Sequence, residues 1–158
     1  MIRELMVNVA KNVPANYSAA TAMVTGMGVT VDFATGTLAL PSSETADGIY
    51  FLEKERTVEG IYASLTDFDD YFEQFVKVKE GEFAEAIPAY AGEMYGTDQY
   101  DTSVKAEAIG KRLAVGADGK WKVASAQVAS RFILAGMQTD GTHTLAMIAV
   151  SDATGKNT

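Results

Sequence analysis

Apolar residues alternate with polar or small ones around two Asp-Gly pairs in the last third of the chain. The pairs are Asp118-Gly119 and Asp140-Gly141. Asp-Gly accepts the positive φ angles of a tight turn, so each pair predicts a β-hairpin between its flanking strands. The final hairpin is expected to join strands at Phe132–Met137 and Thr144–Val150.

A similar alternation predicts strands in the first half of the chain. Val29–Phe33 alternates, the Thr35-Gly36 pair predicts a turn, and Leu38–Leu40 continues the pattern on the other side. Two more strands are expected at Gly48–Leu52 and Thr57–Tyr62, joined by a charged turn. The N-terminal half is therefore expected to be rich in short antiparallel strands.

One segment carries helical rather than β periodicity. Thr66 is a suitable N-cap, and the acidic residues that follow it favour the positive end of the helix dipole. The aromatic residues then fall on one face at helical spacing: Phe68, Tyr71, Phe72 and Phe75. The sequence therefore predicts a short helix over Thr66–Val76, with its aromatic face in the core.

These patterns predict a mainly β single domain with a small barrel-like or tulip-like fold and one short helix. The first residues are expected to be extended because Asn12, Pro14 and Asn16 break regular structure. From start to end, the expected parts are an N-terminal arm (1–16), a β and helical elaboration (17–75), a β core (76–150) and a polar tail (151–158).

Composition narrows the classes of function. The chain has 158 residues, no cysteine and a net charge of −8. Without cysteine, disulfides, thiolate zinc sites, iron–sulfur clusters and cysteine nucleophiles are excluded. The negative charge repels a phosphate backbone, so no direct nucleic-acid partner is expected. No apolar run approaches the about 20 residues of a membrane helix, and Glu4 interrupts the start where a signal peptide would be apolar, so no membrane partner is expected.

Candidate catalytic and metal-binding residues lack the partners that such chemistry needs. His143 is the single histidine, and one histidine without cysteine cannot make a standard structural zinc site. No G-x-S-x-G elbow supplies a nucleophile, and the glycines form no phosphate-binding loop. We therefore predict no enzyme activity, no metal and no cofactor.

Acidic residues are expected to be solvated or to support local structure. Asp67, Asp69 and Asp70 suggest a calcium loop, but aromatic residues stand where an EF-hand loop needs a further ligand and a glycine. The three aspartates fit the start of the predicted helix better. The pair Glu80 and Glu82 is expected on a solvated face rather than in a cleft.

Aromatic residues outside the predicted helix are expected in the core or at an interface. Tyr90, Tyr95 and Tyr100 are five residues apart, a spacing that suits neither one strand face nor one helix face. Trp121 follows the first Asp-Gly turn and should alternate with Val123 on one face of the hairpin. Core packing is one interpretation of Trp121, and a contact between protomers is the other.

The segment Gly110–Lys120, GKRLAVGADGK, is followed by an alanine-rich link and by Phe132–Gly136. This order of hairpin, small-residue link and final strands resembles the C-terminal half of bacteriophage head-decoration (cement) proteins. The turns around Val78–Glu82 and Tyr90–Glu93 are similar to turns of that family. The resemblance covers about residues 76–150.

The resemblance implies an outward-facing structural protein of the virion, made in the host cytoplasm and often trimeric. Such a protein bridges neighbouring major-capsid subunits and carries no active site. The acidity of this chain suits an outer surface, away from packaged DNA. A tail or head–tail component is an alternative among structural proteins, and a small ligand-binding or glycan-binding β domain is an alternative from another class.

The contact surface of such a protein is expected in its N-terminal arm and at its β edges, which can add strands to a neighbouring chain. Residues 1 to about 14 are too irregular to predict a core element, so contact with a neighbouring chain is the favoured interpretation. The candidate interface residues are Met1, Ile2, Leu5, Val7, Val9, Val13 and Trp121.

Overall fold

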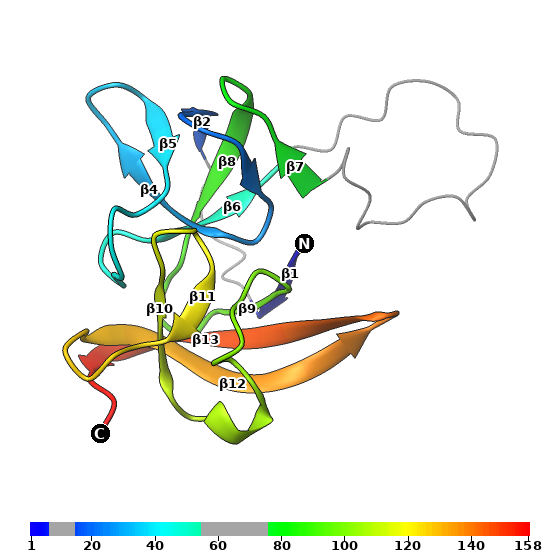
Figure 1. Cartoon of the computed structure of the whole chain (residues 1–158), viewed down its shortest axis with the longest axis vertical. Helices are drawn as coiled ribbons and strands as arrows, with labels where there is room; N and C mark the ends of the chain where they lie inside the picture. Colours follow the sequence, from blue (N-terminus) through cyan, green and yellow to red (C-terminus); the bar gives the residue numbers. More distant parts are fainter. Residues whose placement is uncertain (7–14, 55–75) are drawn as a thin grey trace.

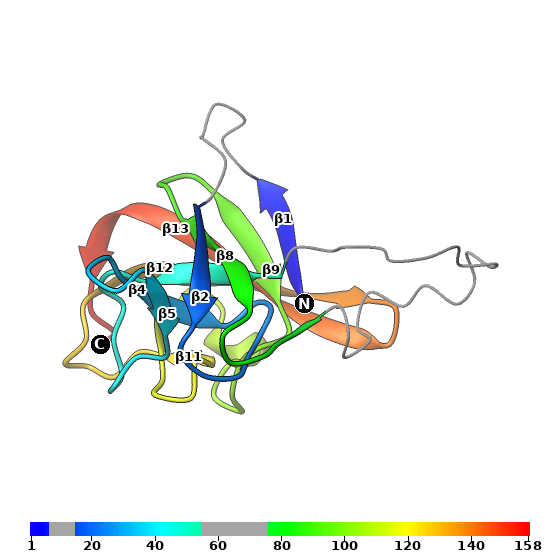
Figure 2. The ribbon, with the colours of Figure 1, turned by 90° about the horizontal axis from the view of Figure 1, so that it is seen from above.

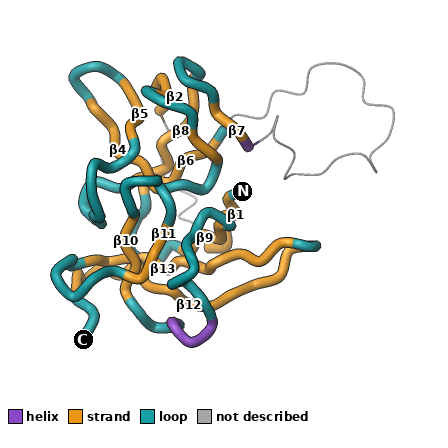
Figure 3. Tube along the Cα trace, viewed as in Figure 1, coloured by secondary structure: helices purple, strands orange, loops and turns teal. Residues whose placement is uncertain are grey.

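The computed structural model describes residues 1–6, 15–54 and 76–158. The strands of these ranges form a closed barrel and a six-stranded sheet, together with a two-stranded ribbon. Figure 1 shows the barrel stacked on the sheet, and Figure 3 shows how little of the described chain is helical. The predicted mainly β, barrel-like fold is confirmed.

The barrel is built mainly from the first third of the chain. Its strands are β2 (Ala15–Ala19), β4 (Gly28–Asp32), β5 (Thr37–Ala39), β6 (Tyr50–Glu53) and β8 (Phe83–Pro88). The order is β2-β5-β4-β6-β8, and the barrel closes because β8 pairs with β2. Its interior is filled by small and branched apolar side chains, among them Val29, Leu38, Leu52, Ala84 and Ala86. The ribbon of β3 (Met23–Val24) and β7 (Lys77–Val78) lies beside it.

The sheet contains the rest of the strands, all paired antiparallel. They are β1 (Ile2–Met6), β9 (Met94–Thr97), β10 (Arg112–Val115), β11 (Trp121–Val123), β12 (Ser130–Asp140) and β13 (His143–Gly155). The order is β1-β9-β13-β12-β10-β11. A 3-10 helix, η2 (Ala106–Ala108), precedes β10. Within the described ranges, no helix has the length and apolar character needed to cross a membrane.

The three hairpins that the sequence predicts with turn residues are all present. Gly36 turns β4 into β5 at φ 68°, Gly119 turns β10 into β11 at φ 77°, and Gly141 turns β12 into β13 at φ 59°. Glycine has no Cβ, so it adopts these left-handed angles without steric cost. Figures 1 and 2 both show the tip of the β12–β13 hairpin extending past the neighbouring strands.

The N-terminal residues depart most from the sequence-based prediction, which expected an extended arm there. Residues 2–6 form β1, which pairs antiparallel with β9, and the side chains of Met1 and Ile2 are 1% and 4% exposed. Burial of two apolar side chains and pairing of the backbone outweigh the irregular pattern that suggested an arm in contact with a neighbouring chain. Ala15 and Asn16 already belong to β2, and residues 7–14 of the predicted arm lie outside the described residues.

The expected parts of the chain also differ from the arrangement of the strands. Strand β8 closes the barrel and β1 joins the sheet, so the two units interleave along the chain instead of meeting at residue 75. The polar tail is shorter than expected because β13 continues to Gly155, opposite Ser130. The predicted strand Thr57–Tyr62 and all of the predicted helix Thr66–Val76 except its last residue lie outside the described residues.

One aromatic side chain joins the barrel to the sheet. Phe51, on β6, stacks on Tyr95 at 4.4 Å and on Trp121 at 4.8 Å between ring centroids. The indole Nε1 of Trp121 donates a hydrogen bond to the carbonyl oxygen of Gly26 at 3.1 Å. Trp121 is fully buried, so core packing is the correct interpretation of this residue, and barrel and sheet share one aromatic core.

Candidate functional site

The single histidine lies at the projecting tip of the β12–β13 hairpin. His143 begins β13 and pairs with Asp140 across the turn, and the Asp140 carboxylate accepts hydrogen bonds from the Arg3 guanidinium at 3.0 and 3.1 Å. This ion pair ties the hairpin tip to β1. In the described part of the chain, no three His, Asp or Glu residues come together as metal ligands would.

Glu82, one of the acidic residues considered in the sequence, supports local structure. Glu82 lies 2.9 Å from the Lys54 ammonium and accepts a hydrogen bond from the backbone N–H of Lys79 at 2.8 Å. Partial burial raises the pKa of Glu82, but these two contacts outweigh it and leave the pKa below its ordinary value. The three aspartates at positions 67, 69 and 70 lie outside the described residues.

The three tyrosines considered together in the sequence have separate roles. Tyr95 is fully buried and donates a hydrogen bond to Glu93 Oε2 at 2.6 Å. The Tyr100 hydroxyl donates to the carbonyl oxygen of Thr144 at 3.1 Å. Tyr90 is 48% exposed, and it is the tyrosine of this set that lines a groove.

This groove lies between the barrel and the sheet and has a volume of about 500 Å³. One wall is the segment that leads into β6, the second follows β8, and the third comes from β12 and β13. Its lining residues are Ala46, Asp47, Gly48, Ile49, Tyr50, Pro88, Ala89, Tyr90, Arg131 and Thr154. The volume is in the range of small-molecule sites in proteins.

Exposed aromatic residues mark a second surface, at the end of the barrel that points away from the sheet. Phe33 is 71% exposed and Phe83 is 67% exposed. The Tyr17 ring meets Phe33 edge to face at 6.3 Å. Phe83 pairs with Ser18, so its side chain lies on the opposite face of the β2–β8 pair from that of Tyr17. We call Tyr17, Phe33 and Phe83 the barrel-end aromatics, a name for the end of the barrel that they share and not for one continuous face.

Two turns hold the barrel-end aromatics at the end of β2. The Ser18 N–H donates to Gly36 in the β4–β5 turn, and the Ala19 N–H donates to Glu82 in the turn before β8. Figure 1 shows both turns at the same end of the barrel. Phe33 and Phe83 therefore stand on a backbone that is fixed by hydrogen bonds.

The β4–β5 turn is further fixed by Asp32. Hydrogen bonds from the Thr35 side chain and from the backbone N–H groups of Ala34 and Thr35 hold the pKa of this carboxyl below its ordinary value. The carboxylate is exposed, so its main effect is to set the shape of the turn that carries Phe33.

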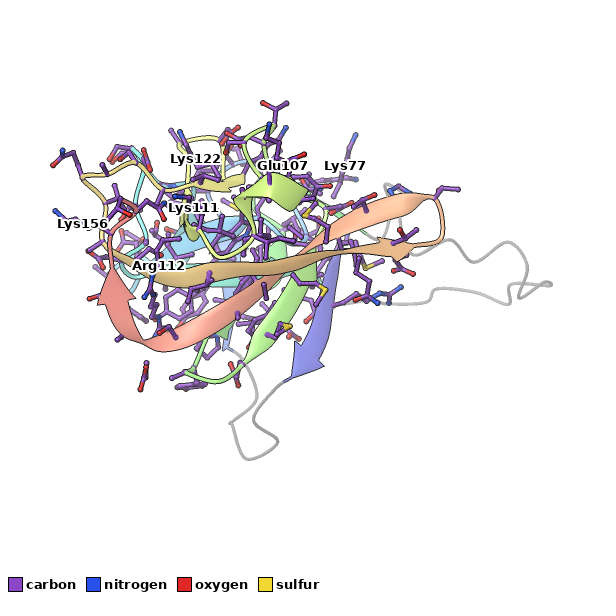
Figure 4. All side chains as sticks on the ribbon, turned by 90° about the horizontal axis from the view of Figure 1, so that it is seen from below. Lys77, Glu107, Lys111, Arg112, Lys122 and Lys156 are labelled. Atoms are coloured by element: carbon purple, nitrogen blue, oxygen red, sulfur yellow. The ribbon has the colours of Figure 1, made fainter. Side chains whose placement is uncertain are left out.

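Basic residues collect where β10, β11 and the C-terminal segment meet. Figure 4 shows them on one side of the molecule, away from Lys77: Lys111, Arg112, Lys122 and Lys156. The pairing of β10 with β11 places Lys122 opposite Ala114, two residues along β10 from Arg112. Arg112 Nη1 donates to the carbonyl oxygens of Ser130 and Ala153, and Lys122 lies 3.9 Å from Glu44. Arg112 and Lys122 are therefore engaged within the chain.

The predicted interface residues do not form an exposed surface where the structure describes them. The side chains of Met1, Ile2 and Trp121 are buried in the core of their own chain, so their assignment to a surface that contacts a neighbour is wrong. For Leu5 the structure describes the backbone within β1. The remaining candidates, Val7, Val9 and Val13, lie outside the described residues.

Sequence reasoning missed the two surfaces that the structure presents. Phe83 precedes a buried alternation and Phe33 ends one, so both look like core positions in the pattern. The groove joins residues far apart in the sequence, and no local motif marks it. The available signals were Tyr90, an aromatic residue that fits no strand or helix repeat, and Arg131, a lone arginine near a strand start.

Comparisons of the chain with protein-family models, with curated proteins and with solved structures gave no match. Any function assigned to this chain therefore depends on its own residues and geometry. The two surfaces that carry exposed chemistry are the barrel-end aromatics and the groove.

Proposed function

We propose that this chain is a structural virion protein that decorates and stabilises a phage capsid by bridging major-capsid subunits. The sequence resemblance over about residues 76–150 suggested this function. The structural observation that supports it best is the pair of exposed phenylalanines, Phe33 and Phe83, on a fixed turn framework. The proposal assigns no catalytic activity, metal or cofactor to the chain.

The barrel-end aromatics have the properties of a protein contact surface. Two phenylalanines that are about two-thirds exposed in the free chain lose unfavourable contact with water when a partner covers them. Rigid aromatic side chains lose little entropy on binding and often dominate interface energies. A capsid subunit with an apolar pocket is the partner that such a surface fits.

Charge and copy number agree with a place on the outer capsid surface. A net charge of −8 is repelled by packaged DNA and is compatible with an exterior position. Weak single contacts suffice because many copies on one shell act together, and a homo-oligomer such as a trimer multiplies them further. We propose the trimer on the strength of the sequence resemblance.

Substitution of both exposed phenylalanines is expected to weaken capsid binding. The double variant Phe33→Ser/Phe83→Ser should bind capsids at least tenfold more weakly than the natural chain, because each lost aromatic anchor removes about 1–2 kcal/mol. Co-sedimentation with purified capsids measures the affinity. The matched control is Ile109→Ser, which removes a side chain that is 51% exposed elsewhere on the surface, and its affinity should be unchanged.

Equal binding by the double variant and the natural chain would show that this surface is not the contact. Co-sedimentation with separated tails, run beside capsids, distinguishes the alternative of a tail or head–tail component. Selective binding to tails would replace capsid decoration with that alternative.

A further inference from the structure

The groove between barrel and sheet combines one arginine with two tyrosines and has fixed walls. Arg131 lies on β12, Tyr50 on β6 and Tyr90 on the turn after β8. These residues come from three separate parts of the chain, and each part is held by backbone hydrogen bonds. The fold itself therefore fixes the shape of the groove.

A β-bulge places Arg131 in the groove. Ser130 pairs with Gly155 and Phe132 pairs with Val150, so the segment Ser151–Thr154 lies opposite Arg131 alone. Extra residues on one strand bend it and redirect nearby side chains, and such bulges are common beside functional sites. Here the bulge brings both Arg131 and Thr154 to the groove wall.

The Arg131 guanidinium keeps donors available for a ligand. Its Nη2 donates to the carbonyl oxygen of Ala89, which fixes the side chain across the groove. In the described part of the chain no carboxylate lies within ion-pair distance of it. A guanidinium has five N–H donors, and the bond from Nη2 to Ala89 uses one of them, so four remain to bind a carboxylate.

The two other walls are equally fixed. Thr45 and Val115 exchange two backbone hydrogen bonds, of 3.0 and 2.8 Å, and anchor the segment before Asp47. The backbone N–H of Tyr90 donates to the buried Glu93 carboxylate at 2.8 Å. A site with fixed walls loses little entropy when a ligand binds.

The remaining lining groups suit a hydroxylated ring. Tyr50 and Tyr90 offer aromatic faces, on which the apolar C–H face of a sugar ring can exclude water. The hydroxyl of Thr154 and the exposed carboxylate of Asp47 can bond sugar hydroxyl groups. The floor is formed by the buried residues Ala46, Ile49 and Ala89.

From these contacts we propose that the groove is a binding site for an acidic saccharide, a sugar whose ring carries a carboxylate. Arg131 binds the carboxylate, the tyrosines cover the ring face, and Asp47 and Thr154 bond the hydroxyl groups. This inference is independent of capsid decoration, since it depends only on the groove.

An NMR titration of the ¹⁵N-labelled full chain tests the site. Trigalacturonate is the acidic probe and maltotriose is the uncharged one. Trigalacturonate should give saturable shifts at the backbone amides of groove residues, with Gly48, Tyr90 and Thr154 as reporters. Arg131→Gln and Tyr90→Ala should each weaken this binding at least tenfold, because they remove the carboxylate partner and one aromatic face.

Two controls keep this test decisive. Lys120→Gln removes one positive charge from an exposed position outside the groove and should leave the affinity unchanged. The amide spectrum of each variant reports whether it is folded, and Tyr90 is exposed, so its substitution spares the core. Absence of shifts in the groove, shifts that map elsewhere, equal affinity for maltotriose, or unchanged binding by both variants would each overturn the proposal.

Discussion

Replacement of Trp121 by alanine is expected to lower the free energy of unfolding by about 3–5 kcal/mol. The side chain is fully buried, and it stacks on Phe51 at 4.8 Å and meets Phe132 edge to face at 4.9 Å. Its Nε1–H also donates a hydrogen bond to the carbonyl oxygen of Gly26. Its loss leaves a cavity at the junction of barrel and sheet, where neither unit can collapse independently. Urea unfolding followed by circular dichroism measures the change.

Trp121→Phe is the matched control for this prediction. Phenylalanine retains an aromatic ring for stacking but loses the Nε1 hydrogen bond, so we expect a smaller loss than for alanine. If alanine cost less than about 1 kcal/mol, the size expected of a surface change, Trp121 would not be part of a shared core.

Substitution of Gly26 by alanine is expected to cost about 3 kcal/mol or more, from backbone strain and overpacking together. Gly26 has φ 94°, and a Cβ atom there would lie 2.4 Å from Thr97 Oγ1 and 2.5 Å from the carbonyl oxygen of Met1. The Met1 atom belongs to the backbone, so β1 would have to move. Thermal and urea unfolding both report this loss.

Gly92→Ala separates the two causes. Gly92 has a similar φ of 88°, but a Cβ there would meet no atom within 4 Å. This variant should therefore show strain alone, about 1–2 kcal/mol. Equal losses for the two variants would mean that Gly26 is not tightly packed against β1 and β9.

Local turn chemistry explains what the sequence predicted well. Asp118-Gly119 and Asp140-Gly141 specify their hairpins through a glycine at positive φ, which depends on adjacent residues only. The alternation at Val29–Phe33 likewise predicts strand β4, although Phe33 lies past its end and is exposed. For these elements, pattern and fold agree because the deciding interactions lie within about ten residues.

Long-range pairing explains what the sequence did not predict. Strand β1 is held by β9, whose residues lie 88 to 95 positions further along the chain than their partners, and its short pattern gave no sign of this partner. Closure of the barrel depends on β8 reaching back to β2. The groove could not be predicted for the same reason: Tyr50, Tyr90 and Arg131 meet only after both units have formed.

The two candidate surfaces differ in how far the sequence pattern indicated them. Tyr90 stood out as an aromatic residue without a helical or strand repeat, and the structure places it at the groove. Phe33 continues the alternation of Val29 and Val31 but lies just past the end of β4, and Phe83 faces away from the buried Ala84 and Ala86, so both remain exposed. At the ends of a strand, the alternation of apolar and polar residues no longer predicts which side chains are buried.

Release of DNA from heated particles tests capsid decoration most directly. A protein that binds only the assembled shell stabilises that shell by its binding free energy, summed over many sites. Particles depleted of this chain should assemble but release DNA at a lower temperature than complete particles. Addition of saturating purified chain should restore the release temperature, and the Phe33→Ser/Phe83→Ser variant should fail to do so. If the purified chain neither binds the depleted particles nor shifts their release temperature, decoration of the capsid is contradicted.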